Sequence, residues 1–289
     1  MEFIDGIRIY VLAEDFAGYS SRFWAQHGIS FFMEIFKGKR RDVILFDTAT
    51  HHMPVLFNAH LLRLNLEDVE YIVLSHSHYD HTGGVLGIMK EINKEVQIFA
   101  HPEIFKESYA IDDEPRYIGP PENMREKIEE YGGKWVLGRD PIEILPGIWT
   151  LGEIPQEERI EYETHKETKV FMKKEGNLIP DYMEDEIGMV VNTPQGIVVI
   201  GGCSHPGIVS MVKRAVEITH REDILAVVGG FHLVNVKEDR IKRTVDDLNS
   251  MGVREIFTGH CTGLRAECEF MKVFGKRFHK LHAGMIIEI

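Results

Sequence analysis

The segment SHSHYDHTGG, residues 75–84, constrains this chain more than any other feature, because three histidines and an aspartate stand within six positions. Imidazole nitrogens and carboxylate oxygens are common ligands of divalent transition metals. An extended or turning backbone places His76 and His78 on one side and displaces Asp80 and His81 toward a neighbouring position. The segment therefore predicts a loop that supplies ligands to one metal ion or to two. A polar loop with histidines there by chance is the alternative, and the dense spacing disfavours it.

Apolar, β-branched runs alternate with helical patterns along the chain, and each half passes from strand-rich sequence to strand–helix alternation. This order predicts an α/β protein in which two sheets pack together with helices on their outer faces, within one domain spanning residues 1–289. Strands are expected at 7–12, 30–36, 43–46, 69–74, 96–100, 142–151, 170–173, 188–193, 197–200, 225–228, 255–258 and 285–289, and helices near 54–64, 85–93, 208–219 and 240–251.

Two stretches, residues 102–140 and 155–185, interrupt that alternation and are rich in proline, glycine and charge. The first is expected to be a long segment with one short helix and no regular strand, and such segments usually have a function of their own. Both stretches begin at predicted strand ends on the same edge of the structure, near His101 and Gly152. Binding loops are usually found at such an edge. They are predicted to cover the site; a surface excursion away from it is the alternative.

Seven histidines directly follow strand-like runs. Because the carboxyl ends of strands line the ligand crevice in α/β proteins, these histidines are expected to converge although they are far apart in sequence. For a lone case such as His101, an isolated hydrogen-bonded histidine is the favoured interpretation. His232 either contacts substrate, stabilising a developing charge, or simply caps its strand. The seven are His76, His78, His81, His101, His205, His232 and His260.

Composition excludes several classes of function. The 46 acidic and 33 basic residues give a formal net charge of −13, which disfavours long nucleic acids as partners but not small phosphodiesters. No apolar run is long enough to span a membrane, and the acidic start is unlike a signal peptide, so a cytoplasmic location is expected. Three cysteines without a CxxC pair argue against a disulfide framework or a cysteine-rich zinc module.

At residues 75–84 the sequence resembles the metallo-β-lactamase superfamily, whose hallmark is an H-x-H-x-D-H loop after a core strand. The resemblance implies an αββα four-layer sandwich of two mixed sheets flanked by helices, and an enzyme that uses one or two divalent metal ions, Zn²⁺ foremost with Mn²⁺ or Fe²⁺ as alternatives. Asp47 in LFDTA matches the acidic residue that orients the metal loop without binding metal. The resemblance and the placement of these residues after strands together imply a set of metal ligands: His76, His78, Asp80, His81, His205 and His260.

The chain departs from that pattern at two ligand positions. The third histidine of many superfamily hydrolases is missing, since Glu153 follows the strand ending in TLG. Cys203 stands where a bridging aspartate is expected, and His205 is the nearest imidazole that could replace the missing histidine. We expect His205 to be the ligand; Cys203 is an alternative ligand or a small buried apolar residue.

The segments HGISFFME, SHSHYDHTGG, GGCSHPGIV, GGFHL and GHCTG are similar to one branch, the archaeal 7,8-dihydropterin-6-ylmethyl-4-(β-D-ribofuranosyl)aminobenzene 5′-phosphate synthases. This resemblance implies a small phosphate-bearing substrate and a condensation that releases diphosphate. Asp80 and His232 are then the candidate catalytic residues, and His27, Arg116 and Tyr117, with Tyr109, the candidate substrate contacts. A small-molecule or cyclic phosphodiesterase or esterase is one alternative, and a non-catalytic metal-binding or redox protein is another.

Overall fold

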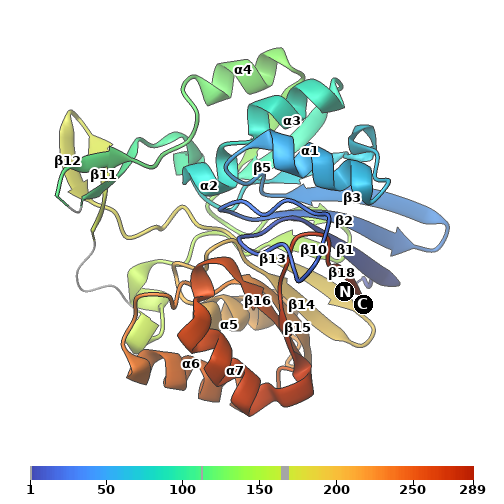
Figure 1. Ribbon diagram of the computed structural model, residues 1–289, viewed down its shortest axis with the longest axis vertical. Coiled ribbons are helices and arrows are strands. Elements are labelled where there is room, and N and C mark those ends of the chain that lie inside the picture. The colour runs from blue at the N-terminus through green and yellow to red at the C-terminus, as the bar shows by residue number, and fades with distance from the viewer. Residues whose placement is uncertain (1, 112, 164–168) are drawn as a thin grey trace.

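The computed structural model describes residues 2–111, 113–163 and 169–289, and shows two seven-stranded sheets packed face to face with helices on both outer faces (Figure 1). The first sheet has the order β18 (Ile286–Glu288), β1 (Gly6–Ala13), β2 (Ser30–Lys37), β3 (Arg40–Phe46), β4 (Tyr71–Val73), β5 (Val96–Ala100), β8 (Gly133–Leu137). The second has the order β17 (Phe278–Lys280), β16 (Glu255–Gly259), β15 (Ile224–Gly230), β14 (Gly196–Ile200), β13 (Met189–Thr193), β10 (Ile148–Thr150), β9 (Glu143–Leu145).

Both sheets are mixed, and their parallel parts are built from strand–helix–strand units. In the first sheet, β3, β4 and β5 run parallel, and in the second, β14, β15 and β16 do. The helices α1 (His52–Leu61), α3 (Val85–Ile92) and α4 (Met124–Glu130) cover the first sheet, and α5 (Ile208–Thr219), α6 (Glu238–Ser250) and α7 (Leu264–Phe274) cover the second. The predicted four-layer α/β sandwich is confirmed.

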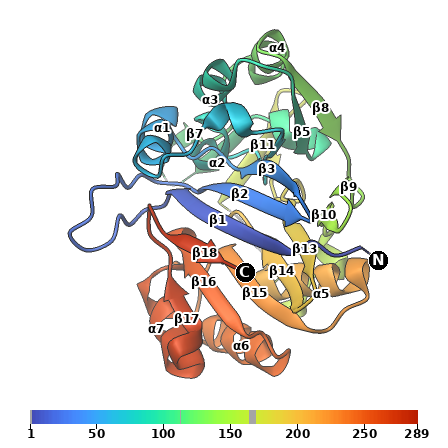
Figure 2. The same ribbon diagram turned by 90° about the vertical axis from the view of Figure 1, so that its right-hand side faces the viewer.

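Alternation of apolar side chains along the strands produces these layers. In β14, Val198 and Ile200 pack into the core between the sheets, whereas Ile197 and Val199 pack against helices. Because both faces of such a strand are buried, it reads as a continuous apolar run. Figure 2 shows β1, β2 and β3 side by side in the first sheet, seen at right angles to Figure 1.

The expectation that residues 102–140 lack regular strands is wrong. β6 (Ser108–Ile111) and β7 (Pro115–Tyr117) form a hairpin, and β8 extends the first sheet beside β5. β6 also pairs with β11 (Val170–Lys174), which pairs with β12 (Asn177–Pro180), so that a third, four-stranded sheet joins the two predicted insertions. Strands of three or four residues carry too little periodicity to be seen in sequence, and these depend on pairing between distant segments.

Two smaller differences concern the second half of the chain. The strand expected at 142–151 is a hairpin of β9 and β10, because Gly147 adopts a positive φ of 100° between them. Helix α7 was not predicted. None of the described helices is long and apolar enough to cross a membrane.

Candidate metal centre

The histidines meet where parallel strands of the two sheets end. Asp47 follows β3, the loop 75–81 follows β4, residues 201–205 follow β14, His232 follows β15 and His260 follows β16. Asp47, His232 and His260 have positive φ angles of 57°, 47° and 49°, a conformation that aspartate and histidine tolerate better than most residues and that turns the chain sharply. Segments far apart in sequence thus bring their side chains to one edge.

His76, His78 and His205 form a first group, in which one nitrogen from each ring lies within 4.8 Å of the others. All three side chains are buried. The Nε2 atoms of His76 and His78 are buried and have no hydrogen-bond partner among the described residues. A buried polar atom without a partner is costly, and a divalent cation would satisfy both nitrogens. The donor set therefore fits a metal ion.

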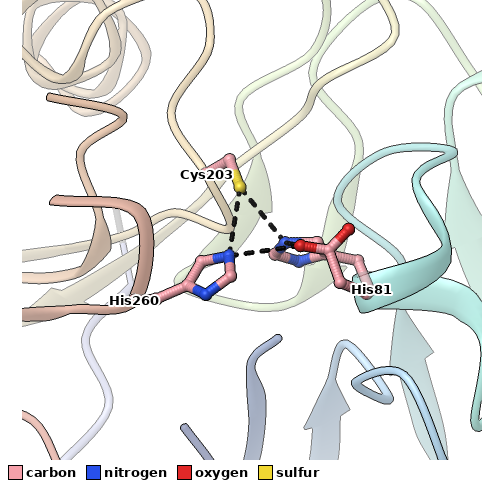
Figure 3. Close-up of side chains that lie close together, drawn as sticks. His81, Cys203 and His260 are labelled. Atoms are coloured by element: carbon pink, nitrogen blue, oxygen red, sulfur yellow. Dashed lines mark hydrogen bonds and ion pairs between the residues drawn. The ribbon is translucent and has the colours of Figure 1, made fainter. Parts of the chain in front are cut away.

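Asp80, His81, Cys203 and His260 form a second group of the same compactness. The Sγ of Cys203 lies 3.2 Å from Nε2 of His81 and 3.4 Å from Nε2 of His260, as Figure 3 shows. An Asp80 carboxylate oxygen lies 3.3 Å from the same His260 nitrogen. A carboxylate, two imidazoles and a thiol are the donors that a borderline ion such as Zn²⁺ accepts.

Cys203 and His205 are both in the cluster, although the sequence presented them as alternatives. His205 belongs to the first group and Cys203 to the second, and both lie within a further group with His232. The His232 ring is 4.3 Å from that of His205, and its buried Nδ1 has no hydrogen-bond partner in the described part of the chain. His232 is therefore placed to meet a ligand bound beside the first group.

Asp47 is fully buried and holds the loop of residues 75–81. One carboxylate oxygen accepts from the backbone N–H of Ser75 at 2.7 Å, and the other lies 2.6 Å from Nδ1 of His81 and 2.7 Å from the Ser75 hydroxyl. Since the carboxylate engages Nδ1, Nε2 of His81 is the nitrogen that faces Cys203. This is the arrangement expected for a residue that orients a metal ligand.

Gly202 permits the close approach of the segment that follows β14 to the loop of residues 75–81. A Cβ at this position would lie 2.3 Å from the Ser75 hydroxyl and 3.0 Å from an oxygen of Asp47. Any side chain would push the segment that carries Cys203 away from His81. The need for glycine here comes from a contact between the two sheets, so sequence alone did not reveal it.

The two groups differ in charge. Burial lowers the pKa of His78 to about 4, so its ring is neutral near pH 7. Burial also disfavours a charged His81, but the carboxylates of Asp80 and Asp47 outweigh it and raise the pKa of His81 to about 10. The second group thus favours positive charge, which a divalent cation would supply.

His27 lies on the exposed side of the second group. Its Nδ1 is 2.8 Å from Asp15, and the other oxygen of Asp15 is 2.5 Å from Nδ1 of His260. Nε2 of His27 lies 3.4 Å from Asp80, and about half of the side chain is exposed. His27, a predicted substrate contact, thus lies beside the cluster.

Four predicted residues lie outside the cluster. His101 follows β5 but pairs with Glu153 at 3.0 Å and contacts Arg139. Arg116 and Tyr117 are exposed on β7. Tyr117 lines a groove of about 750 Å³ together with Phe105, Tyr109 and Arg125, and no residue of the histidine cluster lines it.

Sequence reasoning missed several acidic residues of the site. Asp15 bridges His27 and His260, and the buried Asp185 and Glu186 contact the loops that carry His76, His78 and His205. The acidic residues had no distinguishing signal, since the chain has 46 acidic residues and these three follow no motif. Cys261, adjacent to His260, accepts from the backbone N–H of His232 at 3.3 Å and was also missed.

A family model described as the metallo-beta-lactamase superfamily matches residues 30–203, more than half of the chain. The chain belongs to the metallo-β-lactamase superfamily. It is 50% identical over 286 residues to the 7,8-dihydropterin-6-methyl-4-(beta-D-ribofuranosyl)-aminobenzene-5'-phosphate synthase of Methanocaldococcus jannaschii, covering 99% of this chain and 97% of that protein. An uncharacterized protein of the same organism is 32% identical over 268 residues, covering 93% and 95%. The resemblance stated from the motifs is confirmed.

Solved structures agree with this assignment. The crystal structure of Tm1679, described as a metal-dependent hydrolase of the beta-lactamase superfamily, superposes with a TM-score of 0.81 at 30% identity, covering 98% of this chain and 99% of that one. A diphosphatase from the PhnP family gives a TM-score of 0.52 at 12% identity, covering 99% and 98%. At that identity the second likeness shows the fold alone.

Substituting Asp47→Asn tests the orienting role. In Asp47 one carboxylate oxygen accepts from the Ser75 N–H and the other engages Nδ1 of His81, whereas an amide has only one oxygen that can accept. We therefore expect metal affinity to fall by about 10 to 100-fold. The measurement is competition with a chromophoric zinc chelator. Asp68→Asn, at the surface, is the matched control and should bind as the wild type does. If Asp47→Asn bound zinc with wild-type affinity, the proposed orienting role of Asp47 would be wrong.

The pKa difference predicts that pH affects the two groups differently. A metal ion binding His81 must displace the proton that the metal-free ring holds below its pKa of about 10. Affinity at the second group should therefore rise with pH, up to about tenfold per unit for one proton, between about pH 6 and pH 9. His76 and His78 of the first group should contribute little pH dependence over this range, because burial lowers the pKa of both rings, that of His78 to about 4. Zinc titrations at several pH values, with proton release followed in weak buffer, distinguish this from a uniform pH response.

Proposed function

We propose that the protein is a metal-dependent enzyme that acts on a small phosphate-bearing substrate. Its reaction would join a dihydropterin-methyl diphosphate to a ribofuranosyl-aminobenzene phosphate and release diphosphate. The observation that carries this proposal is the 50% identity to the M. jannaschii synthase over nearly the whole of both chains. The buried histidine cluster is compatible with it, because such a site can neutralise an anionic leaving group.

The two donor groups would hold two divalent ions. His76, His78 and His205 would bind one ion, and Asp80, His81 and His260 the other, with Cys203 beside the second. A thiol in this position favours Zn²⁺, whereas the histidine and aspartate donors also admit Mn²⁺ or Fe²⁺. When bound, the ions would supply positive charge to the diphosphate oxygens.

In the proposed condensation, the arylamine nitrogen attacks the methylene carbon while the carbon–oxygen bond to diphosphate breaks. The diphosphate leaves with the bonding electron pair, and the amine gives up a proton. His232, whose buried Nδ1 lacks a partner among the described residues, would contact the phosphate as charge develops. Asp80 would help to hold the cation and fix its position, and His27 would form the exposed wall beside it.

The third sheet would cover the site and bind the organic part of the substrate. Its support is contact with the metal loop: the Tyr79 N–H donates to the Ile118 carbonyl at 2.9 Å, and the hydroxyls of Ser77 and Ser108 lie 3.4 Å apart. In the adjoining groove, the rings of Tyr109 and Tyr117 pack edge to face. Such aromatic surfaces bind flat heterocycles. Arg116 is adjacent to Tyr117 on β7 but does not line this groove, so a phosphate that pairs with it would lie on the other face of the strand.

Hydrolysis of a small or cyclic phosphodiester or ester is the second candidate. The same histidine cluster would support it, and the structural likeness to a protein described as a metal-dependent hydrolase favours it. A non-catalytic metal-binding or redox protein is a third candidate, since Cys203 is a thiol within the cluster.

The activity test separates these candidates. Metal-reconstituted protein with both proposed substrates should yield the coupled product and one diphosphate per turnover, and the His78→Ala variant should lose nearly all of this activity because the first group loses a donor. The exposed His60→Ala is the control. Turnover of bis-(p-nitrophenyl) phosphate without coupling would favour the hydrolase, and metal binding without turnover of either would favour the third candidate.

The role of the cover is tested by Tyr117→Ala. Loss of one ring from the aromatic groove should raise the KM for the pterin substrate by about tenfold, equivalent to about 1.4 kcal/mol, and leave the KM for the aminobenzene phosphate within about twofold. Steady-state kinetics with each substrate varied in turn provide the measurement, and Tyr19→Ala, on an exposed loop, is the control. Equal effects on both KM values, or none, would contradict binding of the pterin here.

A further inference from the structure

Two consecutive acidic residues, Asp185 and Glu186, lie between the third sheet and β13 and are fully buried. We infer that they are positioning residues that fix the geometry of the first donor group, the three imidazoles of His76, His78 and His205. The inference rests on the proposed metal centre. Two loops supply this group, and each carboxylate contacts one of them. Asp185 contacts the loop that carries His76 and His78, and Glu186 contacts the loop that carries His205.

Glu186 holds the loop after β14. One carboxylate oxygen accepts from the backbone N–H groups of Cys203 and Ser204 at 2.9 and 2.5 Å. The other accepts from the backbone N–H of His205 at 2.7 Å and lies 2.5 Å from Nδ1 of the same residue. A single side chain therefore fixes both the path of this loop and the orientation of the His205 ring.

Asp185 and Ile187 hold the loop after β4. An Asp185 oxygen accepts from the backbone N–H of Ser77, the residue between His76 and His78, at 3.0 Å. The backbone N–H of Ile187 donates to the Ser75 carbonyl at 2.8 Å. The other Asp185 oxygen is 2.6 Å from the ammonium group of Lys106, which also pairs with Asp181. Three consecutive residues thus connect the two ligand loops.

The Glu186 contact also selects the tautomer of His205. Three backbone N–H groups donate to the Glu186 carboxylate, which favours its role as an acceptor. With the carboxylate accepting, Nδ1 of His205 carries the proton and the lone pair that a metal ion needs is on Nε2. In Glu186→Gln the backbone N–H groups of Cys203 and Ser204 would retain the amide oxygen, which turns the amide NH₂ toward Nδ1 and the backbone N–H of His205. An N–H donor there favours a lone pair on Nδ1 and places the proton on Nε2. The substitution preserves size but opposes metal binding.

The experiment is a zinc titration of the metal-free full-length protein, with a chromophoric chelator as competitor. Wild type should bind two equivalents. Glu186→Gln should lose about 10 to 100-fold affinity at the first site, with a smaller loss at the second because Glu186 also accepts from the backbone N–H of Cys203. Asp185→Asn should also weaken the first site. Glu184→Gln, the neighbouring partly exposed acid, is the matched control. Histidine-labelled ¹⁵N spectra of the metal-free proteins should show the Nδ1–H form of His205 in wild type only.

The outcomes separate this inference from the proposed function. Wild type that binds no metal would overturn both. Two sites with wild-type affinity in Glu186→Gln would overturn the inference alone, as would an equal loss at both sites, which indicates a general structural role. If Glu186→Gln does not fold, Glu186→Asp replaces it: this change keeps the charge but withdraws the carboxylate from Nδ1, and it should weaken the first site more than the second.

Discussion

Hydrogen bonds between a carboxylate and the Nδ1 atom of an imidazole organise this site; Asp47 and Glu186 are fully buried, whereas Asp15 is partly exposed. Asp47 contacts His81 at 2.6 Å, Glu186 contacts His205 at 2.5 Å, and Asp15 contacts His260 at 2.5 Å. In each pair the carboxylate engages the same ring nitrogen, and in His81 and His260 the Nε2 atom faces Cys203 at the centre of the cluster. His76 follows the same rule with a hydroxyl, since its Nδ1 lies 2.9 Å from Ser75.

This rule explains why the site needs both sheets. A metal ion requires several lone pairs within a few ångströms, yet neutral imidazoles can present either nitrogen, and a wrong tautomer presents a proton instead. Asp47 lies at the end of a first-sheet strand and orients a histidine of the adjacent strand end. Glu186 precedes a second-sheet strand and orients a histidine that follows the next strand. The sandwich therefore supplies the orienting groups as well as the candidate ligands.

The sequence predicted most of the cluster because its signals are local. His76, His78, Asp80 and His81 share one loop, and His205, His232 and His260 each follow a recognisable apolar strand. A position directly after a strand predicts that a residue lies at the edge formed by the strand ends. It does not predict which other strand ends are close to that residue. His101 shows the difference, because it follows β5, two strands away from β3, and pairs with Glu153 instead of joining the cluster.

What the sequence did not reveal depends on contacts between distant segments. Asp15, Asp185 and Glu186 lie outside regular elements and look like any other acid until the chain is folded. Gly202 matters because of a Ser75 side chain that is remote in sequence. The strands β6 and β7 are too short for a periodic signal, and β6 forms part of a sheet because β11 pairs with it.

Two parts of the third sheet differ in how well they tolerate amino-acid substitutions. At its base, the Lys106 side chain is only 7% exposed and pairs with Asp181 and Asp185. The loss of one member would leave an uncompensated, largely buried charge. At its outer strand, Arg116 and Tyr117 are exposed and take no part in that ion network. Substitutions on β7 can therefore alter what binds in the groove while the base still supports the histidine loops. If the proposed roles hold, substrate choice on this scaffold changes through β7 and its groove, and the geometry of the donor groups is maintained through Asp185 and Glu186.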